Sequence, residues 1–294
     1  MAADDHGLAG VCFRQRCQGS GGAIGQLLEA LAGRSGDPCV GQLWASLHPT
    51  CLDDAVSNAF DEHVMALLAR LSSRGSDAMV WKELWDELYH QYPSDVACAA
   101  VPELAAIAAD GAPSDRFEAV QLAGALLAKA DPYTAEIRER YAGHIATLLR
   151  EAQVELAENS PEDNHDPTSF VLRVQAVLAF EDATIWSEQL IGLLDEEFEI
   201  ICPACWAAMD LYLGERGFFT CTGGYPPETV TRRPLVASHP DELTGLGHRL
   251  HRLAAAARQH TLARQLTYLF GRGTCTENGH QFIPADSVVE LWTS

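Results

Sequence analysis

Lysine is almost absent from this chain of 294 residues, which contains Lys82 and Lys129 and no other. Acidic side chains outnumber basic ones by 41 to 20, so the formal net charge is -21. A surface that follows nucleic-acid phosphates needs clustered lysine and arginine, which release counterions on binding. The composition therefore argues against nucleic-acid binding. A solvated acidic exterior explains the charge; an acidic groove for a basic protein, a peptide or a cationic ligand is the alternative.

The sequence also lacks long apolar runs, and none approaches the ~18 residues that a membrane helix needs. Its first residues are acidic and show no hydrophobic segment of the signal-peptide kind. We therefore expect a cytoplasmic protein without membrane contact, with a disordered or loosely attached tail over residues 1–22. In a reducing cytoplasm, the nine cysteines are expected to be free or to bind metal, because stable disulfides are rare there.

Familiar catalytic motifs are missing as well. The sequence has no nucleophile elbow, no Walker loop, no Rossmann fingerprint and no H-E-x-x-H pair. The glycine-rich stretch Gly19–Gly25 follows no apolar strand and precedes no Lys-Ser/Thr, so it is predicted to be a flexible lead-in to a helix. Whether the protein is an enzyme stays open.

What the chain does have is helical periodicity. Trp81, Leu84, Trp85 and Leu88 fall at i, i+3, i+4 and i+7, which is the apolar stripe of an amphipathic helix. Similar stripes predict helices over residues 41–48, 54–72, 79–90, 94–109, 115–129, 134–158, 170–180, 185–194, 240–260 and 262–270. Ser114 and Asp115 are predicted to cap the fifth of them.

The helical unit recurs. Leu43-Trp44 can be placed over Leu84-Trp85 at an offset of about forty residues, which is within the period of HEAT-type repeats. Chance similarity between two helices rich in alanine and leucine is the alternative. We predict an all-α, HEAT-like α-solenoid of helical pairs, in which each pair completes its burial against the next.

The expected organisation has two helical parts. Helical repeats are predicted over residues 23–158, an acidic, proline-containing loop over 159–168, and further helical repeats over 169–294. A small zinc-ribbon-like β insert is expected within the second part, at residues 198–235 and 272–284. Short strands are predicted at Ile200-Ile201, Met209–Leu213 and Phe218-Phe219, followed by a loop over 223–234 and, at the end of the chain, a last helical turn.

One constellation carries chemistry. Cys202 and Cys205 form a C-x-x-C, and the second half of a ribbon is expected at Cys275, where Asn278 stands in place of the second cysteine. His280, two residues further on, is the predicted fourth ligand of a structural zinc ion, because four ligands must converge tetrahedrally. Two alternatives remain: a metal-free ribbon held by packing of Trp206 and Phe282, and a three-cysteine zinc with an open catalytic position.

A second candidate site is aromatic. A groove lined by aromatic, Glu and His side chains is expected to bind a peptide or a small cationic molecule. Glu87 and His90, one helical turn apart, are the candidate catalytic pair, as a base and its orienting partner. The alternative is that the tryptophans are core residues and His90 caps a helix end. The predicted binding residues are Trp44, Trp81, Trp85, Tyr89 and Tyr92, with His48 nearby.

Four segments of the chain follow a recurring pattern: W-x-x-L-W-x-E-L at Trp81–Leu88, A-x-P-x-L at Ala100–Leu104, E-F-E-x-x-C-P-x-C at Glu197–Cys205 and L-F-G-x-x-x-C-x-x-C-G at Leu269–Gly279. The chain thereby resembles a group of bacterial HEAT-like repeat proteins common in actinobacteria, over about Leu43–Phe282. The resemblance implies helical repeats with a split zinc-ribbon-like insert. Trp206, in place of a glycine, and Asn278 depart from the pattern.

These features predict a cytoplasmic helical-repeat scaffold whose acidic groove binds a protein or peptide partner. The alternative is an enzyme of a specialised, natural-product pathway that uses the aromatic groove for a small molecule. A weaker alternative is an immunity or antitoxin-like protein that blocks a basic toxin.

Overall fold

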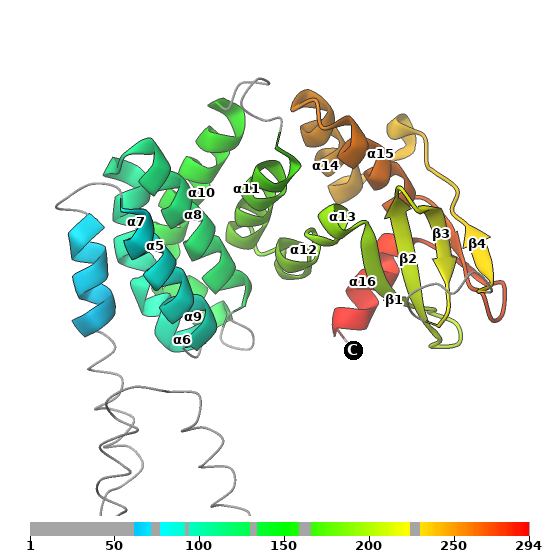
Figure 1. Ribbon diagram of the computed structural model, residues 1–294, viewed down its shortest axis with the longest axis horizontal. Coiled ribbons are helices and arrows are strands. Elements are labelled where there is room, and N and C mark those ends of the chain that lie inside the picture. The colour runs from blue at the N-terminus through cyan, green and yellow to red at the C-terminus, as the bar shows by residue number, and fades with distance from the viewer. Residues whose placement is uncertain are drawn as a thin grey trace, which may run out of the picture. The chain divides into compact units, whose positions relative to one another are not determined.

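The computed structural model describes residues 62–71, 77–91, 94–129, 134–158, 166–223 and 230–293. They belong to two compact units, Met1–Ala100 and Val101–Ser294. Most of these residues are helical, as predicted, and the strands among them form a small antiparallel sheet and a hairpin (Figure 1). Within the described ranges, no helix combines the length and the apolar character needed to cross a bilayer.

The described residues of the first unit are helical, apart from Asp77. A helix over residues 62–71 is followed by α5 (Ala78–Trp85), a π-helix (Asp86–Gln91), α6 (Ser94–Ala97) and a 3₁₀ turn (Cys98–Ala100). Asp77 caps α5, since its carboxylate accepts the N–H groups of Met79 and Val80 at 3.0 and 3.4 Å. The prediction of a regular helix over residues 79–90 is only partly right, because the α-helix gives way to a wider π-helix at Asp86.

The second unit begins with a group of packed helices: α7 (Val101–Asp110), α8 (Pro113–Ala128), α9 (Thr134–Arg140), α10 (Ala142–Glu158), α11 (Pro167–Phe180), α12 (Thr184–Gln189) and α13 (Gly192–Asp195). Helix α8 packs against α7, α10 and α11. A Cβ added at Gly124 of α8 would lie 3.0 Å from the Cα of Ala176 in α11. The small residues thus allow these two helix backbones to approach closely.

The start of α8 differs from the prediction. Its N-cap is Ala112, which makes no side-chain capping bond, and Pro113 occupies the first helical turn. Proline suits that position because the missing N–H would have had no helical partner. Asp115, predicted as a cap together with Ser114, is instead buried inside the helix, with 3% of its surface exposed.

The sheet follows the helices. Its strands β1 (Glu197–Ile201), β2 (Ala208–Gly214), β3 (Gly217–Cys221) and β4 (Arg232–Pro234) pair in sequence order as an antiparallel meander. The prediction of a loop over residues 223–234 is wrong at its end. Strand β4 is an exposed edge without apolar alternation, so the pattern that reveals half-buried strands is absent there.

Two helices, α14 (Gly245–Ala256) and α15 (His260–Leu269), separate this sheet from the hairpin β5 (Gly273–Thr274) and β6 (Gln281–Phe282). The chain nevertheless brings hairpin and sheet together: the Thr220 hydroxyl of β3 donates to the Thr274 carbonyl at 2.7 Å. Val236 and Arg272 form a further antiparallel bridge. A closing helix, α16 (Pro284–Thr293), packs against β1 and is longer than the single turn predicted.

One apolar core unites the sheet with the helices around it. It includes Phe198 and Leu211 from the sheet, Leu266 from α15 and Val288 from α16. Gln265, which is 1% exposed, donates its side-chain amide to the carbonyls of Leu193 and Leu213 at 3.0 and 2.7 Å. Buried polar groups need such partners, and these bonds fix α15 against the end of α13 and strand β2.

Candidate metal centre

The first cysteine pair lies in the tight turn between β1 and β2. The Trp206 N–H donates to the Cys202 carbonyl at 2.8 Å, and the Cys202 N–H donates to the Ala207 carbonyl at 3.0 Å. The backbone of Trp206 is left-handed, with φ of 60°. These bonds close the turn so that both thiols emerge from the end of β1.

The turn between β5 and β6 has the same backbone pattern. The Gly279 N–H donates to the Cys275 carbonyl at 3.1 Å, the Cys275 N–H donates to the His280 carbonyl at 2.9 Å, and Gly279 is left-handed with φ of 73°. Cys275 therefore corresponds to Cys202, and Asn278 corresponds to Cys205. Trp206 takes the position that Gly279 fills in the second turn.

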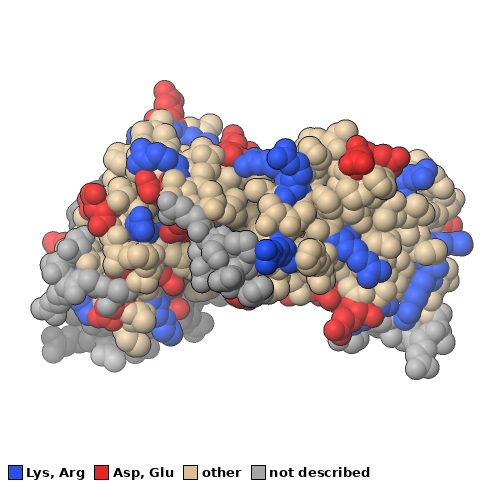
Figure 2. Space-filling model, turned by 90° about the horizontal axis from the view of Figure 1, so that it is seen from above, with Lys and Arg blue, Asp and Glu red and all other residues tan. Residues whose placement is uncertain are grey.

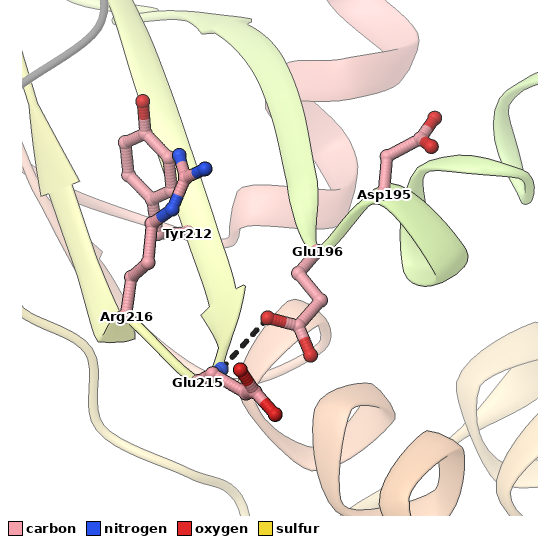
Figure 3. Close-up of a pocket in the computed structure, with 5 residues that line it drawn as sticks. All are labelled: Asp195, Glu196, Tyr212, Glu215 and Arg216. Atoms are coloured by element: carbon pink, nitrogen blue, oxygen red, sulfur yellow. Dashed lines mark hydrogen bonds between the residues drawn. The ribbon is translucent and has the colours of Figure 1, made fainter.

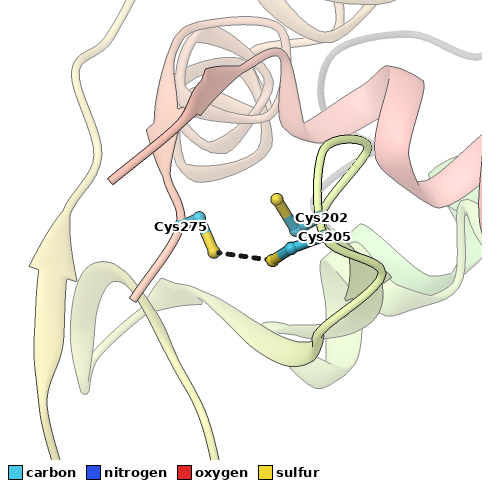
Figure 4. Close-up of side chains that lie close together, drawn as sticks. All are labelled: Cys202, Cys205 and Cys275. Atoms are coloured by element: carbon cyan, nitrogen blue, oxygen red, sulfur yellow. Dashed lines mark hydrogen bonds between the residues drawn. The ribbon is translucent and has the colours of Figure 1, made fainter. Parts of the chain in front are cut away.

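Three thiols meet where the two turns face each other. The Sγ atoms of Cys202, Cys205 and Cys275 all lie within 4.8 Å of one another, and those of Cys205 and Cys275 are 3.8 Å apart (Figure 4). Thiolates bound about 2.3 Å from one tetrahedral ion are about 3.8 Å apart. Cys202 and Cys275 are fully buried and Cys205 is exposed, so the cluster has an inner side and a solvent side.

The surroundings of the two thiols in the first turn shift their pKa values in opposite directions. Burial opposes ionisation of Cys202, but the N–H groups of Ala204 and Cys205, together with hydrogen bonds from the thiols of Cys205 and Cys275, lower the pKa of this thiol. At Cys205 the N–H of Ala207 favours the thiolate, whereas loss of water and the neighbouring thiols of Cys202 and Cys275 raise the pKa. Thiols this close resist ionising together, and a metal ion removes that repulsion.

The amide of Asn278 lies beside the cluster. It lies 3.9 Å from the Sγ of Cys202, and its Oδ1 accepts the N–H of His280 at 2.9 Å. His280, the predicted fourth ligand, is exposed, and its side chain does not join the three thiols. The structure thus brings together three of the four predicted ligands and places an asparagine beside them.

Three other residues bear on how the two turns are held together. Trp206 is 62% exposed, so packing of its ring does not hold the two turns together, whereas Phe282 is buried. Cys221, at the end of β3, is buried outside the cluster, and burial raises the pKa of its thiol. Cys221 therefore offers a matched control for the three clustered cysteines.

The predicted aromatic site is only partly within the described residues. Trp44, His48 and Tyr92 lie outside them. Trp81 is buried in the core, with 3% exposed, as the alternative interpretation expects. Trp85 and Tyr89 are half-buried and meet edge to face with ring centroids 5.8 Å apart.

The candidate catalytic pair lies on the π-helix. Glu87 is half-buried, and His90 is exposed with its ring 5.1 Å from that of Tyr89, edge to face. The wider turn of a π-helix changes how residues three apart are stacked. The role proposed for Glu87 and His90 from their spacing stays a prediction.

A polar pocket of about 160 Å³ lies at the β2–β3 turn, lined by Asp195, Glu196, Tyr212, Glu215 and Arg216 (Figure 3). The Glu196 carboxylate accepts the Glu215 N–H at 2.7 Å. The buried Tyr212 donates its hydroxyl to Glu197 at 3.1 Å; burial and then this bond raise its pKa to about 12. The pocket was not predicted from the sequence, although two pairs of charged residues mark it: Asp195-Glu196 before β1 and Glu215-Arg216 between β2 and β3.

Comparison with protein-family models, curated proteins and solved structures finds no match for this chain. The side-chain geometry is therefore the basis on which a function is proposed.

Proposed function

We propose that this chain binds one zinc ion through Cys202, Cys205 and Cys275, and that the ion fastens the β5–β6 turn to the β1–β2 turn. The observation that carries the proposal is the separation of 3.8 Å between the thiols of Cys205 and Cys275. That distance matches a tetrahedral edge around zinc, for which thiolates are preferred ligands. The two turns lie about seventy residues apart in the chain, so the ion links remote segments of one core.

Elemental analysis tests this assignment. The purified chain is expected to carry about one zinc per molecule, released by a strong chelator. Replacement of the buried Cys221 outside the cluster, as Cys221→Ala, should leave the zinc content unchanged. A chain that folds with the same stability in zinc-free and zinc-supplemented buffer, and carries no metal, would end the proposal.

The helical part is proposed to be a HEAT-like solenoid that acts as a binding scaffold for a basic protein or peptide. Supporting this, α7 packs on α8, α8 on α11 and α10 on α11, so neighbouring helices complete one another's burial. The net charge of -21 attracts cationic partners at long range. On the face drawn in Figure 2, acidic and basic side chains form separate small groups. The attraction therefore comes from the total charge of the chain and not from a single acidic patch on that face.

A defined peptide tests the scaffold. An arginine- and lysine-rich peptide is expected to bind with an affinity that falls roughly tenfold or more from 50 to 300 mM salt, because salt screens exposed charges. Trp85→Ala should weaken the complex, and Trp292→Ala, on the exposed end of α16, should not. Equal binding of an acidic peptide, or an affinity independent of salt, would contradict the scaffold and leave the zinc site untouched.

A further inference from the structure

We infer that the fourth coordination position of the zinc centre, beside Asn278, is exchangeable and accepts an external thiol. The inference rests on the proposed zinc site and assigns it a ligand class. Two features carry it: the backbone equivalence of the two turns, and the chemistry of the one corner that lacks a cysteine.

The equivalence of the turns puts position 278 at the ion. Cys202 and Cys275 start their turns with the same pair of backbone bonds, to the fourth and fifth residues beyond each. The third residue beyond each is Cys205 in one turn and Asn278 in the other. The N–H two residues further on, of Ala207 or of His280, donates to that side chain in both cases. Asn278 thus stands where a fourth thiolate would complete the tetrahedron.

An amide is a weak partner for zinc at this corner. Its oxygen is neutral and hard, whereas a centre with three thiolates is soft. The Oδ1 of Asn278 already accepts the His280 N–H at 2.9 Å. A zinc ion with three protein ligands keeps a position for water or another ligand, and such positions exchange. A thiolate is softer and charged, so it displaces the amide or the water.

Access to this corner comes from one side. Cys202 and Cys275 are buried, whereas Cys205, Asn278 and His280 are exposed. An incoming thiol therefore reaches the ion past Asn278 without passing through the core. The step is a ligand exchange: the thiol releases its proton to solvent, a zinc–sulfur bond forms, and the bond to the amide or water breaks, with no change in oxidation state.

Cobalt(II) in place of zinc makes the exchange visible, because thiolate-to-cobalt absorption reports the number of Co–S bonds. The probes are 2-mercaptoethanol and, as a harder ligand, imidazole. In the unchanged chain, 2-mercaptoethanol should raise this absorption saturably by about one third, as three bonds become four. Imidazole should change it less. Gel filtration checks that cobalt stays on the protein.

Matched variants separate the outcomes. Asn278→Cys closes the site, so it should show the four-sulfur spectrum at once and ignore added thiol. Asn278→Ala should respond at least as strongly as the unchanged chain, and His280→Ala should respond like it. A cobalt-loaded chain that ignores thiol, or that responds only after His280→Ala, overturns the inference and leaves the zinc site standing. Failure of both the unchanged chain and Asn278→Cys to bind metal overturns the proposed function itself.

Discussion

Cys202→Ser is expected to abolish zinc binding and to lower the free energy of unfolding of the second unit by about 4 kcal/mol, when free zinc exceeds the dissociation constant about a thousandfold. The thiol of Cys202 is fully buried and belongs to the cluster. A serine hydroxyl there is a poor zinc ligand, so the folded state loses the ion that links the two turns. Urea unfolding with and without added zinc measures the loss.

A chelator separates the metal from the cost of the substitution. It should destabilise the unchanged chain strongly and Cys202→Ser hardly at all, because the variant has no zinc to lose. Cys221→Ala should lose about 1 to 2 kcal/mol from the cavity it leaves, and it should keep its full response to the chelator. Equal chelator responses of Cys202→Ser and the unchanged chain would show that the cluster holds no stabilising ion.

The sequence correctly predicts that the thiols of Cys202, Cys205 and Cys275 come together, because the spacing of cysteines reflects the geometry of the turns that carry them. The prediction of His280 as a fourth ligand followed from the preference of zinc for histidine over an amide, and the structure leaves the side chain of His280 outside the group of thiols. The backbone hydrogen bonds explain why His280 lies outside the group. The His280 carbonyl accepts the Cys275 N–H, which makes residue 280 the end of the turn, like Ala207 in the first. The C-x-x-C spacing had already placed Asn278 at the position of the second cysteine.

The predicted aromatic site shows a second way in which spacing along the sequence is insufficient. The stripe from Trp81 to Leu88 correctly predicts a buried helix face, since Trp81, Leu84 and Leu88 are 3%, 0% and 1% exposed. Apolar spacing assumes 3.6 residues per turn, however, and the π-helix from Asp86 to Gln91 departs from it. The relation between Glu87 and His90 therefore could not be taken from spacing alone. Strand β4 was not predicted because its three residues are all exposed, so the sequence shows no alternation of buried and exposed positions there.

Gly271→Ala is expected to destabilise the second unit by about 3 kcal/mol or more, near the upper end for overpacking. Gly271 follows the end of α15. The segment that precedes α14, including Val236, passes close to Gly271. A Cβ there would lie 2.2 Å from the Val236 carbonyl oxygen and 2.8 Å from that of Thr267. Both atoms belong to the backbone, so no side-chain rotation relieves the clash.

The damage should extend to the metal centre. Val236 and Arg272 exchange backbone hydrogen bonds of 2.9 and 2.8 Å, and Cys275 lies three residues beyond Arg272. Moving Val236 away from Arg272 therefore moves the second turn relative to the first, so Gly271→Ala should also bind zinc more weakly.

Gly143→Ala in α10 is the matched control, because its new Cβ meets nothing within 4 Å. It should keep zinc affinity and leave stability unchanged or higher by up to about 1 kcal/mol, because alanine favours helices. Similar unfolding midpoints for the two variants, measured in urea, would show that the crossing of these segments tolerates a side chain at Gly271.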